Sequence, residues 1–176
     1  MSEVWNSVRV YGPSSEISRF KRLCMAPSEA SNTGDHEGWN GCDCVITVPV
    51  DDPRGNGSAF SDYVWNFHHD DGPGDNRYAF NFDTDCRFPV DLFERIAQAF
   101  PALAFDCSCI HSMDEFMGYG WFNTPAGGED FSQDYDVPKD YWTSGSGYKR
   151  GPAAQLRHAA LIAHLERVAR EADDRS

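Results

Sequence analysis

The stretch that decides the fold runs from Arg77 to Phe122 and reads RYAFNFDTDCRFPVDLFERIAQAFPALAFDCSCIHSMDEFMGYGWF. Apolar and small or polar side chains alternate over residues 78–82, which predicts a strand with one buried face. Pro89 suits the first turn of a helix, and apolar residues then recur on one helical face as far as Phe100. Alternation returns at residues 103–110. The stretch therefore predicts a β-α-β unit with a right-handed crossover.

The remaining chain adds elements on both sides of this unit. Alternation over Val4–Val10 predicts a first strand, and the apolar spacing after Ser14 predicts a helix. Pro152 opens a further helix whose amphipathic stripe must pack on the domain or on another chain. Three more strands are expected, at Cys44–Val50, at Tyr63–Phe67 (as a strand or a helical turn) and at Tyr119–Phe122.

The chain is strongly acidic. It carries 28 Asp and Glu against 15 Lys and Arg, a formal net charge of −13 at pH 7. This charge argues against direct binding to DNA or RNA, because contacts to phosphates need clustered Lys and Arg. Two explanations remain: a solvated surface that promotes solubility, or an acidic face that meets a basic partner.

No apolar run has the length of a signal peptide or a membrane span. We therefore expect a soluble, cytoplasmic protein of a bacterial host cell, without a membrane partner. In that compartment the six cysteines are expected to be reduced thiols. They are Cys24, Cys42, Cys44, Cys86, Cys107 and Cys109.

Four short motifs follow one another over residues 4–122. They are NSVRVYG (6–12), FDT (82–84) followed by Pro89, a helix ending in FPALAF (100–105), and EFMGYG (115–120). In this order they resemble the YubB-type ferredoxin-like domain family of bacteriophage and conjugative-plasmid proteins. The tryptophan-rich middle segment of that family is replaced here by Trp65-Asn66-Phe67. The resemblance implies an accessory protein of a mobile element, without an iron–sulfur cluster and without catalytic residues to carry over.

Pattern and resemblance together predict an α+β fold of the ferredoxin-like βαββαβ type. In this sandwich two helices cover one face of an antiparallel sheet, and a C-terminal helix is added. A length of 176 residues fits one domain. We expect residues 1–122 to form it, residues 123–150 to be an extended aromatic and glycine-rich segment, and residues 151–176 to be the helix packed on it.

Histidines and aspartates suggest a metal site. His68, His69, Asp83 and Asp85 are of the types that bind divalent ions, and His111 follows a later strand. Adjacent histidines in a strand point to opposite faces, however, and cannot easily share one ion. An acidic polar loop explains the same run without chemistry.

Cysteines form two pairs of Cys-x-Cys type, Cys42 with Cys44 and Cys107 with Cys109. Four thiolates could bind zinc if the pairs met, but the spacing differs from the Cys-x-x-Cys of zinc knuckles. Alternation places Cys107 and Cys109 in the core instead. Ser112 follows His111 without a G-x-S-x-G elbow, so we interpret that region as a polar hairpin and predict no catalytic residue.

The leading functional hypothesis is a non-enzymatic, acidic protein-interaction module with a host protein or a second copy as its partner. One alternative is a DNA mimic that inhibits a DNA-binding host enzyme by presenting carboxylates where phosphates would lie. Another is a metal-dependent enzyme that uses the histidines and aspartates named above. We predict no cofactor.

Overall fold

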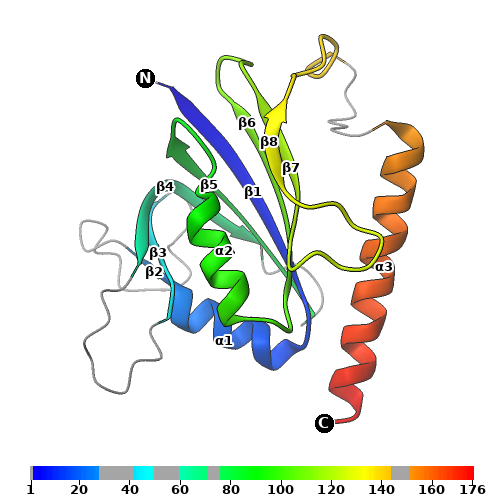
Figure 1. The fold of residues 1–176 in the computed structure, drawn as a ribbon. Helices are drawn as coiled ribbons and strands as arrows, with labels where there is room; N and C mark the ends of the chain where they lie inside the picture. Colours follow the sequence, from blue (N-terminus) through cyan, green and yellow to red (C-terminus); the bar gives the residue numbers. More distant parts are fainter. Residues whose placement is uncertain (1, 28–41, 50–59, 71–75, 144–150) are drawn as a thin grey trace.

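The structure is a computed structural model that describes residues 2–27, 42–49, 60–70, 76–143 and 151–176. Its helices and strands are shown in Figure 1. The helices are α1 (Ser14–Cys24), α2 (Val90–Ala99) and α3 (Pro152–Asp174). The strands are β1 (Glu3–Tyr11), β2 (Met25–Pro27), β3 (Cys42–Thr47), β4 (Ser61–Asp70), β5 (Arg77–Asp85), β6 (Ala104–His111), β7 (Met117–Phe122) and β8 (Ser132–Tyr135).

β1 lies in the middle of a single antiparallel sheet. On one side it pairs with β5, so that Val8 lies opposite Phe80. On the other side it pairs with β6, so that Val8 also lies opposite Cys107. The complete order is β2-β3-β4-β5-β1-β6-β7-β8, and both neighbours of β1 come from distant parts of the chain.

The main core lies between the sheet and the two helices α1 and α2, which cover the same face (Figure 1). Phe20 of α1 packs edge-on against Phe105, with ring centroids 5.5 Å apart. Phe93 of α2 stacks on Phe82 at 6.3 Å. All four rings are fully buried. Each buried Phe contributes about 1.5–3 kcal/mol, so this aromatic core fixes both helices on the sheet.

α3 packs on the opposite face of the sheet from α1 and α2. Three of its side chains contact a small separate cluster formed by Tyr11, Ala104 and Trp121. Within α3 only Ala169 is buried. The residues that α3 contributes to this contact are Leu161, Ile162 and Leu165.

Polar contacts along its length also attach α3 to the domain. His158 lies 3.0 Å from Asp106, both side chains being largely buried. The Asp173 carboxylate accepts a hydrogen bond from the backbone N–H of Ser14 at 3.2 Å. Asp173 therefore supplies the N-terminal cap of α1 that the residue at its own N-cap, Pro13, does not.

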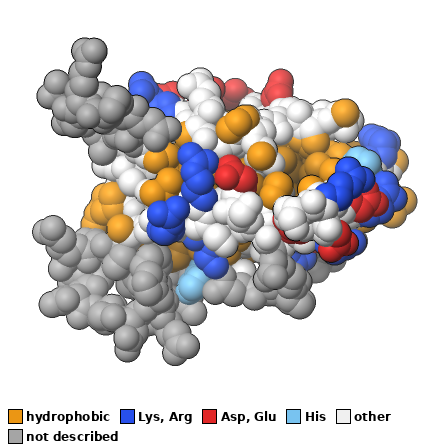
Figure 2. Space-filling view, turned by 90° about the horizontal axis from the view of Figure 1, so that it is seen from below, with side chains coloured by type: hydrophobic (Ala, Val, Ile, Leu, Met, Phe, Trp, Pro, Cys, Tyr) orange, Lys and Arg blue, Asp and Glu red, His pale blue; other side chains and the backbone are white. Residues whose placement is uncertain are grey.

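A shallow hollow of about 260 Å³ lies between the start of α1, the turn before β6 and the second half of α3. Figure 2 shows hydrophobic side chains exposed on this underside, with charged side chains around them. None of the helices in the described ranges is both long and apolar enough to span a bilayer.

The prediction of a ferredoxin-like βαββαβ sandwich is wrong. Within the described ranges the sheet contains eight strands against three helices, so strands dominate the fold; the third helix, α3, is the C-terminal helix that was predicted. β2 and β3 extend one edge, while β7 and β8 extend the other. β8 forms within residues 123–150, where no strand was expected; residues 144–150 of that segment lie outside the described ranges.

β8 can lie against β7 because two positions of β7 have no side chain. A Cβ at Gly120 would be 2.5 Å from the carbonyl oxygen of Asp130, and one at Gly118 would be 2.8 Å from the backbone of Gln133. Gly120 also has φ +137°, which favours glycine. The individual predicted elements β1, α1, β5, α2 and β6 are confirmed.

Candidate binding pocket between β4, β5 and α2

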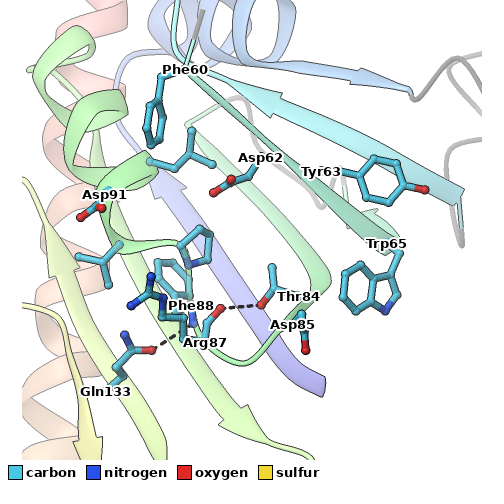
Figure 3. A pocket seen from close by; sticks show the side chains of 13 residues that line it. Phe60, Asp62, Tyr63, Trp65, Thr84, Asp85, Arg87, Phe88, Asp91 and Gln133 are labelled. Carbon is cyan, nitrogen blue, oxygen red and sulfur yellow. Dashed lines mark hydrogen bonds between the residues drawn. The ribbon is translucent and has the colours of Figure 1, made fainter. Parts of the chain in front are cut away.

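A pocket of about 420 Å³ opens where β4 separates from β5, beside the N-terminus of α2. Figure 3 shows the side chains around this opening. We call it the fork pocket. Its lining is Phe60, Asp62, Tyr63, Trp65, Thr84, Asp85, Arg87, Phe88, Pro89, Val90, Asp91, Leu92 and Gln133.

The pocket exists because β4 pairs with β5 along only part of its length. On its other edge β4 pairs with β3 from Ser61 to Phe67. Its pairing with β5 begins at Trp65, which lies opposite Asp83, and is interrupted by a bulge before His68. A bulge bends and twists a strand. The first half of β4 therefore diverges from the end of β5 and leaves a gap between them.

The lower rim of the pocket is the turn that connects β5 to α2. The Thr84 hydroxyl donates a hydrogen bond to the Arg87 carbonyl at 2.8 Å, and it accepts one from the buried Asn6 amide at 2.9 Å. The backbone N–H of Phe88 donates to Gln133 of β8 at 3.0 Å. Since side chains from three strands hold this turn, the rim is formed before any ligand arrives.

Charge in the pocket is predominantly negative. Asp62, Asp85 and Asp91 contribute three carboxylates, and Arg87 contributes the one guanidinium of the lining. Figure 3 shows Asp62 and Asp91 above Arg87, with Asp85 beside it. The upper wall is completed by Phe60, whose ring is covered by the Arg95 guanidinium at 4.4 Å.

Two aromatic side chains border the outer side of the pocket. Trp65 is partly exposed, and Tyr63 is 52% exposed. The Tyr63 hydroxyl donates a hydrogen bond to the Asp43 carboxylate of β3, and this bond raises the pKa of Tyr63. Aromatic faces and carboxylates around one opening are the combination that attracts Lys and Arg side chains. The arrangement can therefore hold a cation.

The predicted metal-binding residues are brought together only in part. His68 lies 3.1 Å from the Asn66 side chain, which in turn donates to Asp83 at 3.0 Å. Asp85 lines the fork pocket. His69 lies on the other side of β4, near the rings of Phe67 and Tyr78.

His111 is buried at the far end of β6, where its ring packs against Phe116. Within the described ranges, no group of three or more His, Cys, Asp or Glu side chains is placed to hold a metal ion. The prediction that adjacent histidines diverge is confirmed for His68 and His69.

Most of the described cysteines lie in the hydrophobic core. Cys44, Cys107 and Cys109 are buried thiols, and Cys86 is an exposed one. Burial raises the pKa of Cys107 well above its usual value. Cys107 and Cys109 belong to the core, as predicted; the side chain of Cys42 lies outside what the structure describes.

Sequence reasoning did not identify the fork pocket. The alternation of Tyr63 and Trp65 predicted a strand, and the strand is confirmed. Nothing local shows that the first half of this strand diverges from β5, because its pairing on either edge depends on segments about 20 residues away. Asp62 and Asp91 therefore had no apparent connection in the sequence.

Comparison with known proteins gives no assignment. No family model, no curated protein and no solved structure matches the chain.

Proposed function

We propose that the chain is a non-enzymatic protein-interaction module that holds a basic side chain of a partner protein in the fork pocket. The observation that carries the proposal is the lining of this pocket, where three carboxylates and two accessible aromatic rings surround one opening. The net charge of −13 favours the approach of a basic partner over longer distances.

The energetics support a specific but modest contact. A cation over an aromatic ring gains about 0.5–1 kcal/mol at an exposed site and about 2 kcal/mol when it is desolvated. An exposed ion pair adds up to about 1 kcal/mol. The rim of the pocket is already fixed by hydrogen bonds from Thr84 and Gln133, so binding orders few protein groups.

Arg87 gives the pocket a second chemical character. As a guanidinium at the rim, it can donate hydrogen bonds to carbonyl oxygens. An extended peptide offers a carbonyl on each side of every side chain. A basic residue within an extended segment would thus satisfy the carboxylates with its side chain and Arg87 with its backbone.

The sequence resemblance to phage and plasmid proteins suggests where such a partner is found. A cytoplasmic accessory protein of a mobile element would meet host proteins, and a basic segment of one of them is the partner we propose. The DNA-mimic alternative has less support, because the described carboxylates are divided between the fork pocket and the C-terminal helix α3, where Glu171 and Asp174 are exposed. The metal-dependent alternative gains no converging ligand set in the described ranges.

The test is a titration with blocked tripeptides, Gly-Arg-Gly and Gly-Lys-Gly, followed by NMR, with Gly-Gln-Gly as the uncharged control. We expect binding of the basic peptides only. Asp62→Asn combined with Asp85→Asn should weaken it about tenfold, since two ion pairs at up to about 1 kcal/mol each are lost. Glu171→Gln combined with Asp174→Asn, which removes two exposed carboxylates from the end of α3, is the matched control for net charge, and neither change should alter binding.

Equal weakening by Glu171→Gln combined with Asp174→Asn would show that only the net charge matters. Unchanged affinity of the Asp62→Asn, Asp85→Asn variant would refute the pocket as the binding site.

A further inference from the structure

The carboxylate of Asp83 lowers the stability of the fold because it is buried. Its side chain lies on the face opposite α1 and α2, and the residue is only 9% exposed. No Lys or Arg pairs with it in the part of the chain that the structure describes, and its one hydrogen bond comes from Asn66 at 3.0 Å. Burial accordingly raises the pKa of Asp83. A buried carboxylate without a cation costs stability, so its presence needs a reason.

Asn66, the partner of Asp83, is itself strained. It has φ +50° and lies in the bulge of β4. Asparagine tolerates this left-handed conformation better than most residues, but at some cost. The bulge aims its amide at Asp83 and its carbonyl oxygen at His68, 3.1 Å away. A strained backbone, such as that of Asn66 beside the Asp83 carboxylate, occurs often at functional sites.

Tryptophans flank this carboxylate on both sides. Asp83 lies directly opposite Trp5 of β1 and directly opposite Trp65 of β4. Directly paired residues of neighbouring strands share a face, so all three side chains project from the same side of the sheet. Trp5 is 41% exposed, with its ring edge-on to Trp142 at 6.1 Å, and Trp65 is partly exposed, whereas Asp83 is only 9% exposed.

We propose that this Trp5–Asp83–Trp65 row is a second cation subsite and that it binds the guanidinium of an arginine side chain. Neighbouring strands lie about 4.8 Å apart, which places the two tryptophan backbones about 10 Å apart with Asp83 on the strand between them. A planar guanidinium fits this arrangement because it stacks on aromatic faces, is weakly hydrated and donates several hydrogen bonds to one carboxylate. A compact, strongly hydrated ammonium fits it less well.

The charges around the row agree with a cationic ligand. Glu3 of β1 raises the pKa of Asp83 through its negative charge, and His68 acts in the opposite sense. A guanidinium would be attracted by the negative charge of both Asp83 and Glu3. Trp65 also borders the fork pocket, so the two subsites adjoin. The inference rests on the proposed function and narrows its partner to a segment that contains arginine.

The experiment titrates the full chain with N-acetyl-arginine methylamide and, separately, with N-acetyl-lysine methylamide. Indole N–H signals in NMR spectra provide the readout, assigned through Trp5→Phe and Trp65→Phe variants. We expect arginine to shift the signals of Trp5 and Trp65, with lysine binding at least threefold more weakly. Trp5→Ala and Asp83→Asn should each weaken arginine binding about fivefold or more. Asp70→Asn, an exposed carboxylate change farther along β4, is the matched control and should leave it unchanged.

The two subsites fail in different ways. Trp5 and Asp83 do not line the fork pocket, whereas Asp62 and Asp91 do. If Asp62→Asn weakens binding while Trp5→Ala does not, the row is refuted and the proposed function stands. If only Trp5→Ala and Asp83→Asn weaken it, the row stands and the fork pocket is refuted. An unchanged Trp5 signal at saturating arginine also overturns the inference. Amide spectra of each variant show that it is folded.

Discussion

Replacing Asn123 by alanine should destabilise the domain by about 2–5 kcal/mol. The Asn123 side-chain amide donates to three backbone carbonyls that end α2 and lead into β6: Ala97 at 2.9 Å, Phe100 at 3.0 Å and Leu103 at 2.9 Å. An amide has two hydrogens, so these contacts amount to about two hydrogen bonds, each worth roughly 0.5–1.5 kcal/mol. Asn123 also has φ +53°, which costs alanine about 1–2 kcal/mol.

Urea denaturation followed by circular dichroism measures this loss, and two further variants separate its causes. Asn123→Gly removes the hydrogen bonds but accepts the positive φ, so it should cost about 1–3 kcal/mol, less than alanine. Asn123→Asp offers only acceptors to three carbonyls and should be at least as harmful as alanine. A change below about 0.5 kcal/mol for all three variants would refute the reasoning, because it would mean that these contacts do not persist in solution.

Three other perturbations test the remaining features. At pH 7, Asp83→Asn should be more stable than the wild type in urea denaturation. The difference should shrink as pH falls through the raised pKa of Asp83 toward its ordinary value of 3.8, because the folded chain then keeps a proton that the unfolded chain releases. An unchanged difference would contradict the burial of this carboxyl. Site-resolved alkylation should label the exposed Cys86 long before Cys24, whose pKa burial raises to about 12; equal rates would show that the core opens readily. His158→Ala should loosen α3 from the sheet, because the His158 ring packs 5.5 Å from Trp121 and its Nε2 lies close to Asp106. Trp121 should then become accessible to an aqueous fluorescence quencher. The control is Leu156→Ala on the exposed side of α3; equal quenching of the two variants would show that the polar contact does not hold the helix.

The elements that local pattern specifies could be predicted, and the sheet that assembles them could not. Alternation at Tyr78, Phe80 and Phe82 fixes the buried face of β5, and these residues are indeed in the core. β8 has four residues with no apolar alternation, and it becomes a strand only because the glycines of β7 allow the chain to lie against them. The fold class was therefore misjudged at the edges of the sheet.

The candidate sites show the same division. That His68 and His69 diverge follows from the period of a strand, which is local information. That Trp5, Asp83 and Trp65 share one row depends on the register of three strands taken from different parts of the chain. Register is set by the whole hydrophobic pattern and by the turns, so no single motif contains it.

The central position of β1 has a consequence for how the chain folds during synthesis. β1 leaves the ribosome before its neighbours β5 and β6, which end only at Asp85 and His111. At about 5–20 residues per second, the central strand remains without these partners for on the order of several seconds. During that interval its valines are open to chaperones and to other nascent chains. Slow translation of the segment before β5 should therefore lower the soluble yield, and expression at reduced temperature with added chaperone should restore it.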